Sequence, residues 1–310
     1  RVCVYTVCVH ILYGFRKTEK VLFPSVQVSS SFPGIANTIT WIDGWYNLFW
    51  VRQELRRRGG MVENIPAHNN NTFVASLKAC AKKKDLCEGI RLHAHILERL
   101  SLEKNPYIAS TLIHMYTQCG ELDRARQVLE SLPFRDVVSW SALISGYVQQ
   151  GQGHEALNCF VEMKHNGISP DVITFISILK ACGSTCAIEK GKQIHEEIFS
   201  KGLLHKDIML DNALVDMYAK FGMLAKAQQV LEDLSIRDTI SWSALIAGYS
   251  QKGKFDEALN CFEQMQREGL DPNEVTFLSV LNACSQTGKL VEAQVYYEKM
   301  SQKYGFTPQV

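Results

Sequence analysis

Two stretches of sequence decide the fold. Residues 137–171 read VVSWSALISGYVQQGQGHEALNCFVEMKHNGISPD, and residues 239–273 read TISWSALIAGYSQKGKFDEALNCFEQMQREGLDPN. Their tryptophans, Trp140 and Trp242, are 102 residues apart. In each stretch an apolar run with helical spacing passes through a glycine break into a second apolar stripe, and a glycine and a proline close it. Each stretch therefore predicts two consecutive helices.

The same 102-residue period extends over most of the chain. Phe73, Phe175 and Phe277 recur at this spacing in TFVASLKAC, TFISILKAC and TFLSVLNAC, and Tyr116 and Tyr218 recur in MYTQCG and MYAKFG. A segment of 102 residues is too long for one helix pair and divides into three. The predicted units are 70–105, 106–136, 137–171, 172–207, 208–238, 239–273 and 274–309. Because one helix pair cannot bury its own apolar face, stacked pairs predict an all-α, right-handed α-solenoid.

The composition restricts the possible functions. The chain of 310 residues is 46% hydrophobic with a net charge of +1, so it is neither a disordered polar tract nor a protein that holds nucleic acid by charge alone. No apolar stretch is long enough to cross a membrane. The ten cysteines form no C-x-x-C pair and lie in apolar runs, which favours buried thiols over a metal site or a disulfide framework.

The unit lengths carry a further resemblance. Units of 36, 31 and 35 residues alternate in a fixed order, and the segments DNALVDMYAKFGMLAKAQQVLEDL at 211–234 and LKACGSTCAIEKGKQIHEEI at 179–198 keep the register. Together with residues 137–171, they resemble the plant pentatricopeptide repeat family in its PLS subclass, over residues 70–309. In that order 70–105, 172–207 and 274–309 are long units, 106–136 and 208–238 short units, and 137–171 and 239–273 standard units. A peptide-binding tetratricopeptide array, the neighbouring alternative, keeps a uniform period of about 34 residues.

The resemblance implies that each unit binds one nucleotide of single-stranded RNA. In the family the fifth and the last residue of a unit read the base edge, and the second residue packs on the base face. The fifth and last residues of the short and standard units are Ser110 and Asp136, Ser141 and Asp171, Asn212 and Asp238, and Ser243 and Asn273. The second residues are Tyr107, Val138, Met209 and Ile240.

The family code translates these pairs into bases. A hydroxyl with Asp favours G, Asn with Asp favours U, and a hydroxyl with Asn favours A, so residues 106–273 imply the core GGNUA. The unspecified base belongs to unit 172–207, whose fifth residue, Ile176, cannot hydrogen-bond; Val74 and Leu278 are the corresponding residues of the other long units. Ser, Asn and Asp are also common helix N-caps, which is the structural alternative for every pair.

The sequence predicts no active site and no cofactor. His195 and Glu197 form the H-x-E start of a zinc deaminase signature, but P-C-x-x-C is absent, and His93 occupies the same repeat position as His195. Neither a phosphate-binding loop nor a nucleophile elbow occurs. We therefore predict neither catalytic nor metal-binding residues. The resemblance implies a role in cytidine-to-uridine RNA editing, with a deaminase or other editing proteins acting in trans or a further C-terminal domain. Transcript stabilisation or processing is the alternative, and a peptide-binding scaffold a third.

Residues 1–69 match no repeat. They carry eight Lys or Arg against four Asp or Glu, which is compatible with an organelle transit peptide, but Trp41, Trp45 and Trp50 do not suit one. The first residue is Arg and not Met. An equally good interpretation is therefore that the N-terminal segment is translated from upstream sequence and that the protein starts at Met61. The resemblance implies that the protein is located in an organelle, a mitochondrion in the first place and a chloroplast as the alternative. It also implies that the last segment, KYGFTPQV, leads into further C-terminal domains of the family.

Overall fold

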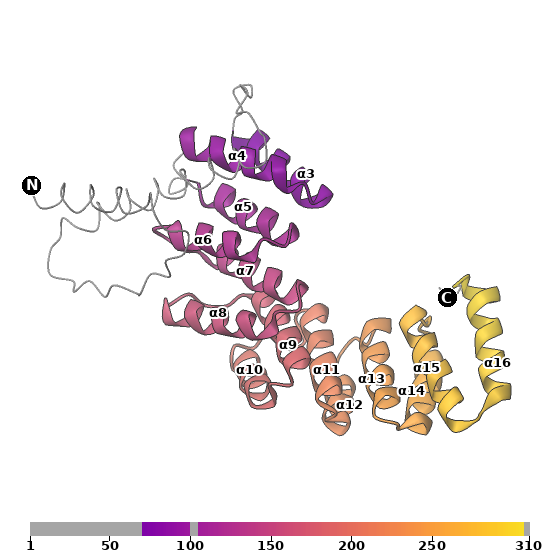
Figure 1. Ribbon diagram of the computed structural model, residues 1–310. Helices are drawn as coiled ribbons and strands as arrows, with labels where there is room; N and C mark the ends of the chain where they lie inside the picture. Colours follow the sequence, from indigo (N-terminus) through magenta and orange to yellow (C-terminus); the bar gives the residue numbers. More distant parts are fainter. Residues whose placement is uncertain (1–69, 100–104, 307–310) are drawn as a thin grey trace, which may run out of the picture. The chain divides into compact units, whose positions relative to one another are not determined.

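A computed structural model describes residues 70–99 and 105–306, and all of its regular elements there are helices (Figure 1). The unmatched segment 1–69 lies outside the described residues. The helices follow one another as pairs. The first helices of the pairs are α3 (Asn70–Lys83), α5 (Pro106–Gln118), α7 (Val137–Gln149), α9 (Val172–Thr185), α11 (Ile208–Phe221), α13 (Thr239–Gln251) and α15 (Glu274–Thr287). The second helices are α4 (Leu86–Arg99), α6 (Leu122–Ser131), α8 (Gly153–His165), α10 (Ile188–Ser200), α12 (Leu224–Asp233), α14 (Phe255–Arg267) and α16 (Leu290–Glu298), and α16 continues into the π-helix η2 (Lys299–Lys303).

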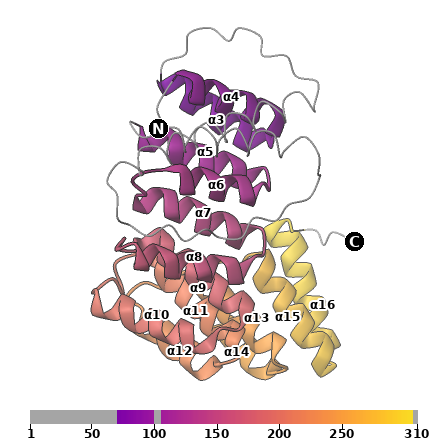
Figure 2. The ribbon, with the colours of Figure 1, turned by 60° about the vertical axis from the view of Figure 1, so that its left-hand side comes forward.

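The helix pairs stack in chain order (Figure 2). Each first helix packs against its own second helix and against the first helix of the next pair, so α3, α5, α7, α9, α11, α13 and α15 form one continuous layer. Each second helix also packs on the first helix of the following pair. The prediction of an all-α array of stacked helix pairs is thus confirmed, while the division into long, short and standard units stays a prediction.

Each first helix from α5 to α15 begins after a side-chain cap. Asp136, Asp171 and Asp238 accept hydrogen bonds from backbone N–H groups of the first turn of α7, α9 and α13, and Asn273 does the same for α15. Such caps satisfy N–H groups that have no partner within the helix. They fix where each first helix starts and hence which side chains its first turn presents.

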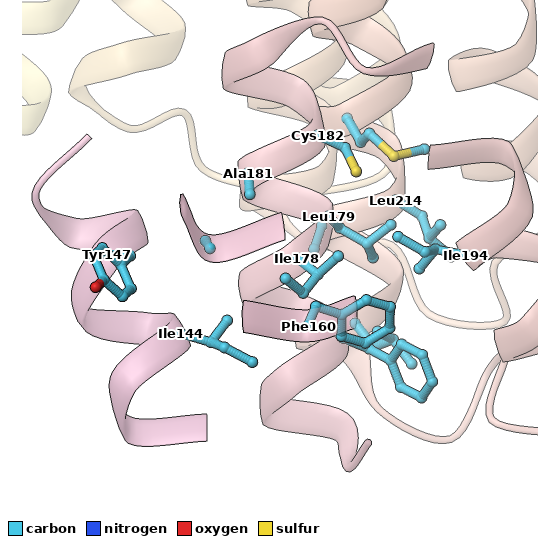
Figure 3. Packing of buried hydrophobic residues seen from close by; sticks show 14 of the residues in the cluster. Ile144, Tyr147, Phe160, Ile178, Leu179, Ala181, Cys182, Ile194 and Leu214 are labelled. Atoms are coloured by element: carbon cyan, nitrogen blue, oxygen red, sulfur yellow. The ribbon is translucent and has the colours of Figure 1, made fainter. Parts of the chain in front are cut away.

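Large apolar side chains at equivalent repeat positions fill the space between the layers (Figure 3). Phe175 of α9 is fully buried, and its ring centroid lies 6.4 Å from that of Phe160 in the preceding α8. One period later Phe277 lies 5.8 Å from Phe262. These contacts join a second helix to the first helix of the next pair, so the core is continuous from pair to pair.

Close approach of neighbouring first helices requires glycine at one repeat position. A Cβ atom on Gly146 of α7 would lie 2.3 Å from Thr117 Cγ2 of α5, and a Cβ on Gly248 of α13 would lie 2.8 Å from the Cβ of Ala219 in α11. The two glycines are one period apart. Their missing side chains let the backbones of the first-helix layer come together.

A histidine–tyrosine pair, buried at His93 and half-buried at His195, also recurs once per period. His93 Nδ1 lies 2.8 Å from Tyr116 Oη, and His195 Nδ1 lies 2.8 Å from Tyr218 Oη. Both pairs join a second helix to the following first helix. His195 therefore serves a packing role in the repeat, which agrees with the rejection of its H-x-E segment as a zinc site.

Burial makes His93 a source of acid sensitivity. Desolvation, together with the positive charge of Arg124, lowers the pKa of His93 from its ordinary value of 6.5 to about 3. The neutral ring is thus retained in the folded protein while the unfolded chain binds a proton below pH 6.5, so stability falls as the pH drops from 6.5 towards 3. The loss is about 1.4 kcal/mol per pH unit, or about 2 kcal/mol at pH 5. Urea unfolding at pH 7 and pH 5 measures this loss of unfolding free energy. The loss should be smaller in the variant His93→Gln. It should be unchanged in the control variant His154→Gln, because His154 is exposed.

Candidate nucleic-acid interface

A row of exposed apolar side chains runs along the first-helix layer. Tyr107, Val138, Met209 and Ile240 are the second residues of α5, α7, α11 and α13, and each is more than half exposed. Isolated exposed apolar side chains are ordinary, but one per helix pair at a constant position is a pattern. The row presents one apolar contact at each step of the stack.

Two further members of this row were not predicted from the sequence. Ile173 of α9 and Val275 of α15 occupy the same second position and are 61% and 54% exposed. The sequence signal was available, since these residues are 102 apart and follow the same unit starts. With them, an exposed apolar side chain stands at the second position of six consecutive first helices, without interruption at the predicted spacer units. This row, Tyr107, Val138, Ile173, Met209, Ile240 and Val275, is called the apolar row below.

The predicted fifth residues lie one helical turn beyond the apolar row and are largely buried. The side chains of Ser110, Ser141, Asn212 and Ser243 are each less than one tenth exposed. A polar side chain buried there needs a partner. Those partners prove to be the capping residues of the next helix in three of the four units.

In the two units 137–171 and 239–273 a threonine completes the pair. Ser141 Oγ donates to Asp171 Oδ1 at 3.2 Å and lies 2.6 Å from Thr174 Oγ1. One period later Ser243 Oγ donates to Asn273 Oδ1 at 3.3 Å and lies 2.7 Å from Thr276 Oγ1. The fifth residue of one pair and the N-cap of the next helix are therefore joined across the boundary.

In both clusters the capping side chain uses only one of its two polar atoms. Asp171 Oδ1 accepts from Ser141, from Thr174 N and from Thr174 Oγ1. Asn273 Oδ1 accepts from the equivalent three groups. The other terminal atom of Asp171 is Oδ2, which is an acceptor. The other terminal atom of Asn273 is Nδ2, which is a donor.

Asn212 and Asp238 form a third joined pair. Asn212 Nδ2 donates to Asp238 Oδ2 at 3.0 Å, while Asp238 Oδ1 caps α13 by accepting from Ile240 N and Ser241 N. Only the amide nitrogen can donate to a carboxylate, so the orientation of the Asn212 amide is fixed. Asn212 Oδ1 is buried and has no hydrogen-bond partner. It is an acceptor in need of a donor.

The fourth predicted pair is not joined. Ser110 Oγ donates to its own helix at Tyr107 O, 3.1 Å away, and Asp136 accepts from Ser139 N at 2.8 Å. No hydrogen bond links Ser110 to Asp136 within the described part of the chain. The threonine that bridges the other serine pairs is replaced here by Ser139, whose hydroxyl is buried and unpartnered.

Capping alone does not distinguish reading units from spacers. Asn105 and Asp207, the last residues of two predicted long units, cap α5 and α11 in the same manner as Asp238 caps α13. The preceding fifth residues are the apolar Val74 and Ile176. In the six units from 70–105 to 239–273 the last residue therefore caps the next helix, and only its pairing with a polar fifth residue is special.

Basic side chains flank the apolar row at one repeat position. Lys78 Nζ donates to Tyr107 Oη at 2.9 Å, and Lys180, one period later, is exposed on α9. The 102-residue spacing of Lys78 and Lys180 is the sequence signal for this pair. A cation beside an exposed apolar row is suited to a phosphate next to a base.

Two other kinds of site are absent from the described residues. No group of three or more His, Cys, Asp or Glu in them could hold a metal ion. Of the helices in 70–99 and 105–306, none has the length and apolar character to cross a bilayer. The surface of interest is thus the apolar row and the polar pairs behind it.

Comparison with known proteins identifies this repeat. A model described as the PPR repeat family matches residues 135–184 and 237–286, and a PPR repeat model matches residues 107–137, 212–237 and 275–304. Together these matches cover more than half of the chain. The chain belongs to the PPR repeat family. The matched segments include the short and standard units on which the candidate pairs lie.

Curated relatives are plant PPR proteins. A pentatricopeptide repeat-containing protein of Arabidopsis thaliana is 37% identical over 238 residues, which are 77% of this chain and 47% of the relative. The chloroplastic pentatricopeptide repeat-containing protein CRR2 of the same plant is 38% identical over 245 residues, which are 77% of this chain and 37% of that protein. This chain spans about half or less of the length of these relatives.

A solved PPR structure has the same fold. The pentatricopeptide repeat protein PPR10, in complex with an 18-nt psaJ RNA element, superposes with a TM-score of 0.60 at 20% identity, over 89% of this chain and 41% of that chain. PPR10 from maize in a second structure gives a TM-score of 0.57 at 22% identity, over 91% of this chain and 43% of that chain. At this identity the match concerns the stacked helix pairs of the PPR fold.

Proposed function

We propose that this PPR protein binds single-stranded RNA in a sequence-specific manner, with the core GGNUA along residues 106–273. The observation that carries the proposal is the combination of an unbroken apolar row with polar pairs whose spare atoms differ from unit to unit. A base face packs on the side chains of the row, and the base edge meets the pair behind it. The likeness to PPR10, which was solved with bound RNA, supports this proposal.

The spare atoms of three pairs complement the bases that the family code assigns. Asn212 Oδ1 is an acceptor and matches the N3–H donor of uracil. Asp171 Oδ2 is an acceptor carrying negative charge and matches the N1–H and N2–H donors of guanine. Asn273 Nδ2 is a donor and matches the N1 acceptor of adenine. Each wrong base would leave a polar group unpaired, which costs about 1–3 kcal/mol. Ser110 and Asp136 lack a joined geometry and are proposed to read G on the code alone.

The binding proposal is tested by gel shift with residues 61–310, since the described array lies within them. RNA carrying GGNUA is compared with a scrambled RNA of equal composition at one stated salt concentration. Tighter binding of GGNUA supports both the RNA class and the code. Equal binding of both RNAs contradicts the code, and absence of binding to either contradicts RNA recognition by this array.

The finer proposal is that the array belongs to the PLS subclass and selects sites for cytidine-to-uridine editing in a mitochondrion or a chloroplast. The chain contributes recognition, and a deaminase or other editing protein supplies the chemistry. Editing predicts a target cytidine a few nucleotides 3′ of the bound tract, whereas stabilisation or processing predicts a transcript end there. Crosslinking the protein to organelle RNA and sequencing the bound tracts distinguishes the two outcomes.

The capping and reading roles of the last residue are separable by a matched pair of variants. Asp207→Ala and Asp238→Ala each remove the cap of a first helix and are both expected to lower the free energy of unfolding by about 0.5–2 kcal/mol. Only Asp238→Ala also removes the partner of Asn212, so only it should abolish the preference for U at one nucleotide. Thermal unfolding and competition gel shifts measure the two effects. Equal loss of base preference in both variants would contradict a reading role for Asp238.

A further inference from the structure

The two units that resemble each other most differ in one buried place, beside the tryptophan of each first helix. In the second of them, Trp242 Nε1 donates to Glu268 Oε2 at 2.9 Å, and Arg237 Nη1 donates to Glu268 Oε1 at 2.8 Å. One carboxylate thus receives an indole N–H and a guanidinium N–H at once. This clamp fills the space between α13 and the end of α14.

In the first unit the carboxylate is missing. Asn166 stands one period before Glu268, and its amide donates back to Glu162 O at 2.8 Å. Trp140, only 2% exposed, has a buried Nε1 atom with no hydrogen-bond partner among the described residues. A buried donor without a partner is costly, and this one lies at the position where its counterpart holds a carboxylate.

A cavity occupies the vacated place. It has a volume of about 80 Å³ and is lined by Trp140, Leu143, Arg135, Arg126 and Asn166, among others. The corresponding space beside Trp242 measures about 10 Å³. One water molecule needs at least about 10–15 Å³ of such volume, so the Trp140 cavity admits a molecule of several heavy atoms and the other is essentially filled.

The second donor of the clamp is also in place. Arg135 donates from Nε to Leu129 O at 3.1 Å and from Nη2 to Glu130 O at 3.0 Å, as Arg237 does to the equivalent carbonyls. These bonds orient the guanidinium identically in both units. Among the described residues Arg135 has no carboxylate partner, whereas Arg237 has Glu268.

The charges around the cavity are balanced before any ligand enters. Arg126 donates to Glu130 Oε1 at 2.9 Å and to both Glu162 oxygens, at 2.8 and 2.9 Å, so the two acidic side chains of the lining are already paired. With Arg135 included, the lining has two positive and two negative groups. Both carboxylates are hydrogen-bonded to Arg126, so the donors that an added anion would meet are the Arg135 guanidinium and the Trp140 N–H.

We propose that the cavity beside Trp140 is a binding site for a small monocarboxylate of the size of formate or acetate. The carboxylate accepts from Trp140 Nε1 and from Arg135 Nη1 and so takes the place that the side chain of Glu268 occupies one period later. A ligand with so few heavy atoms binds with a Kd on the order of 1 mM or weaker. The site is distinct from the apolar row and is independent of RNA binding.

The test titrates sodium formate against sodium chloride at matched ionic strength, using the full chain with ¹⁵N-labelled tryptophan. Formate is expected to shift the indole N–H resonance of Trp140, assigned with Trp140→Phe, and to raise Tm saturably by a few degrees. Chloride should do neither. Absence of both responses in the unsubstituted protein would overturn the proposal and leave the cavity as a site for water only.

Two reciprocal substitutions distinguish the site from a general salt effect. Asn166→Glu supplies the missing carboxylate, so it should raise Tm without formate and abolish the formate response. Glu268→Asn removes the other carboxylate, so it should lower Tm and make the indole resonance of Trp242 shift with formate as well. An undiminished formate response in Asn166→Glu would overturn the proposal.

Discussion

Replacing Asn273 with Asp is expected to change the base preferred by unit 239–273 from A to G. The substitution keeps the size of the side chain and keeps Oδ1, which caps α15 and accepts from Ser243 and Thr276. It changes only the other terminal atom, from the donor Nδ2 to a carboxylate oxygen. The expected change in the ratio of affinities for A and G is about 10- to 100-fold, because one wrong contact costs about 1–3 kcal/mol.

Competition gel shifts with GGNUA and GGNUG measure this exchange. The reciprocal variant Asp171→Asn serves as the matched control, since it should change G to A at a different nucleotide and leave the last one unaffected. Both variants should unfold at nearly the same temperature as the unsubstituted protein. A preference for A that survives Asn273→Asp would contradict the assignment of base reading to this atom.

Replacing Phe175 with Ala is expected to lower the free energy of unfolding by about 3–5 kcal/mol. Phe175 is fully buried, and its ring lies against that of Phe160 of α8. Truncation would leave a cavity at the junction of two helix pairs. It would therefore weaken both the packing within unit 172–207 and the packing of this unit on the preceding one. The effect should exceed that of any single cap removal.

Urea unfolding followed by circular dichroism measures this loss. Phe199→Ala on α10 is the matched control, because Phe199 is 71% exposed and its removal should change stability by no more than about 0.5 kcal/mol. A similar effect of the two substitutions would mean that the core does not extend across the boundary between the pairs.

The helix pairs and their stacking were predictable from the sequence because both depend on apolar periodicity and on glycine and proline breaks. The two stretches that contain Trp140 and Trp242 predicted α7, α8, α13 and α14. The 102-residue period extended this prediction to the other helix pairs. The packing role of His195 against Tyr218 was also predictable, since His93 occupies the same repeat position. These features depend on local sequence patterns, which can be recognised before any contact in the structure is known.

The candidate site was predictable only in part. The fifth and last residues came from a family resemblance, and their contact depends on side-chain geometry that no spacing contains. Ser110 and Ser141 each donate to a carbonyl of their own helix, but Ser141 also reaches Asp171 and Thr174. The cavity beside Trp140 could not be predicted from the sequence either, because it depends on how Asn166, in place of Glu268, and the other differing side chains of the lining pack around two donors.

The joined pairs have a consequence for how such arrays can be recombined. Ser243 belongs to one helix pair, but its partner Asn273 is fixed by the first turn of α15, which belongs to the next. A genetic crossover at the loop before α15 would therefore divide one reading element between two parents and produce a hybrid preference that neither parent had. Modules cut within the first turn of each first helix, between its third and fifth residues, would instead keep Ser243, Asn273 and Thr276 together and exchange a complete element with its preference.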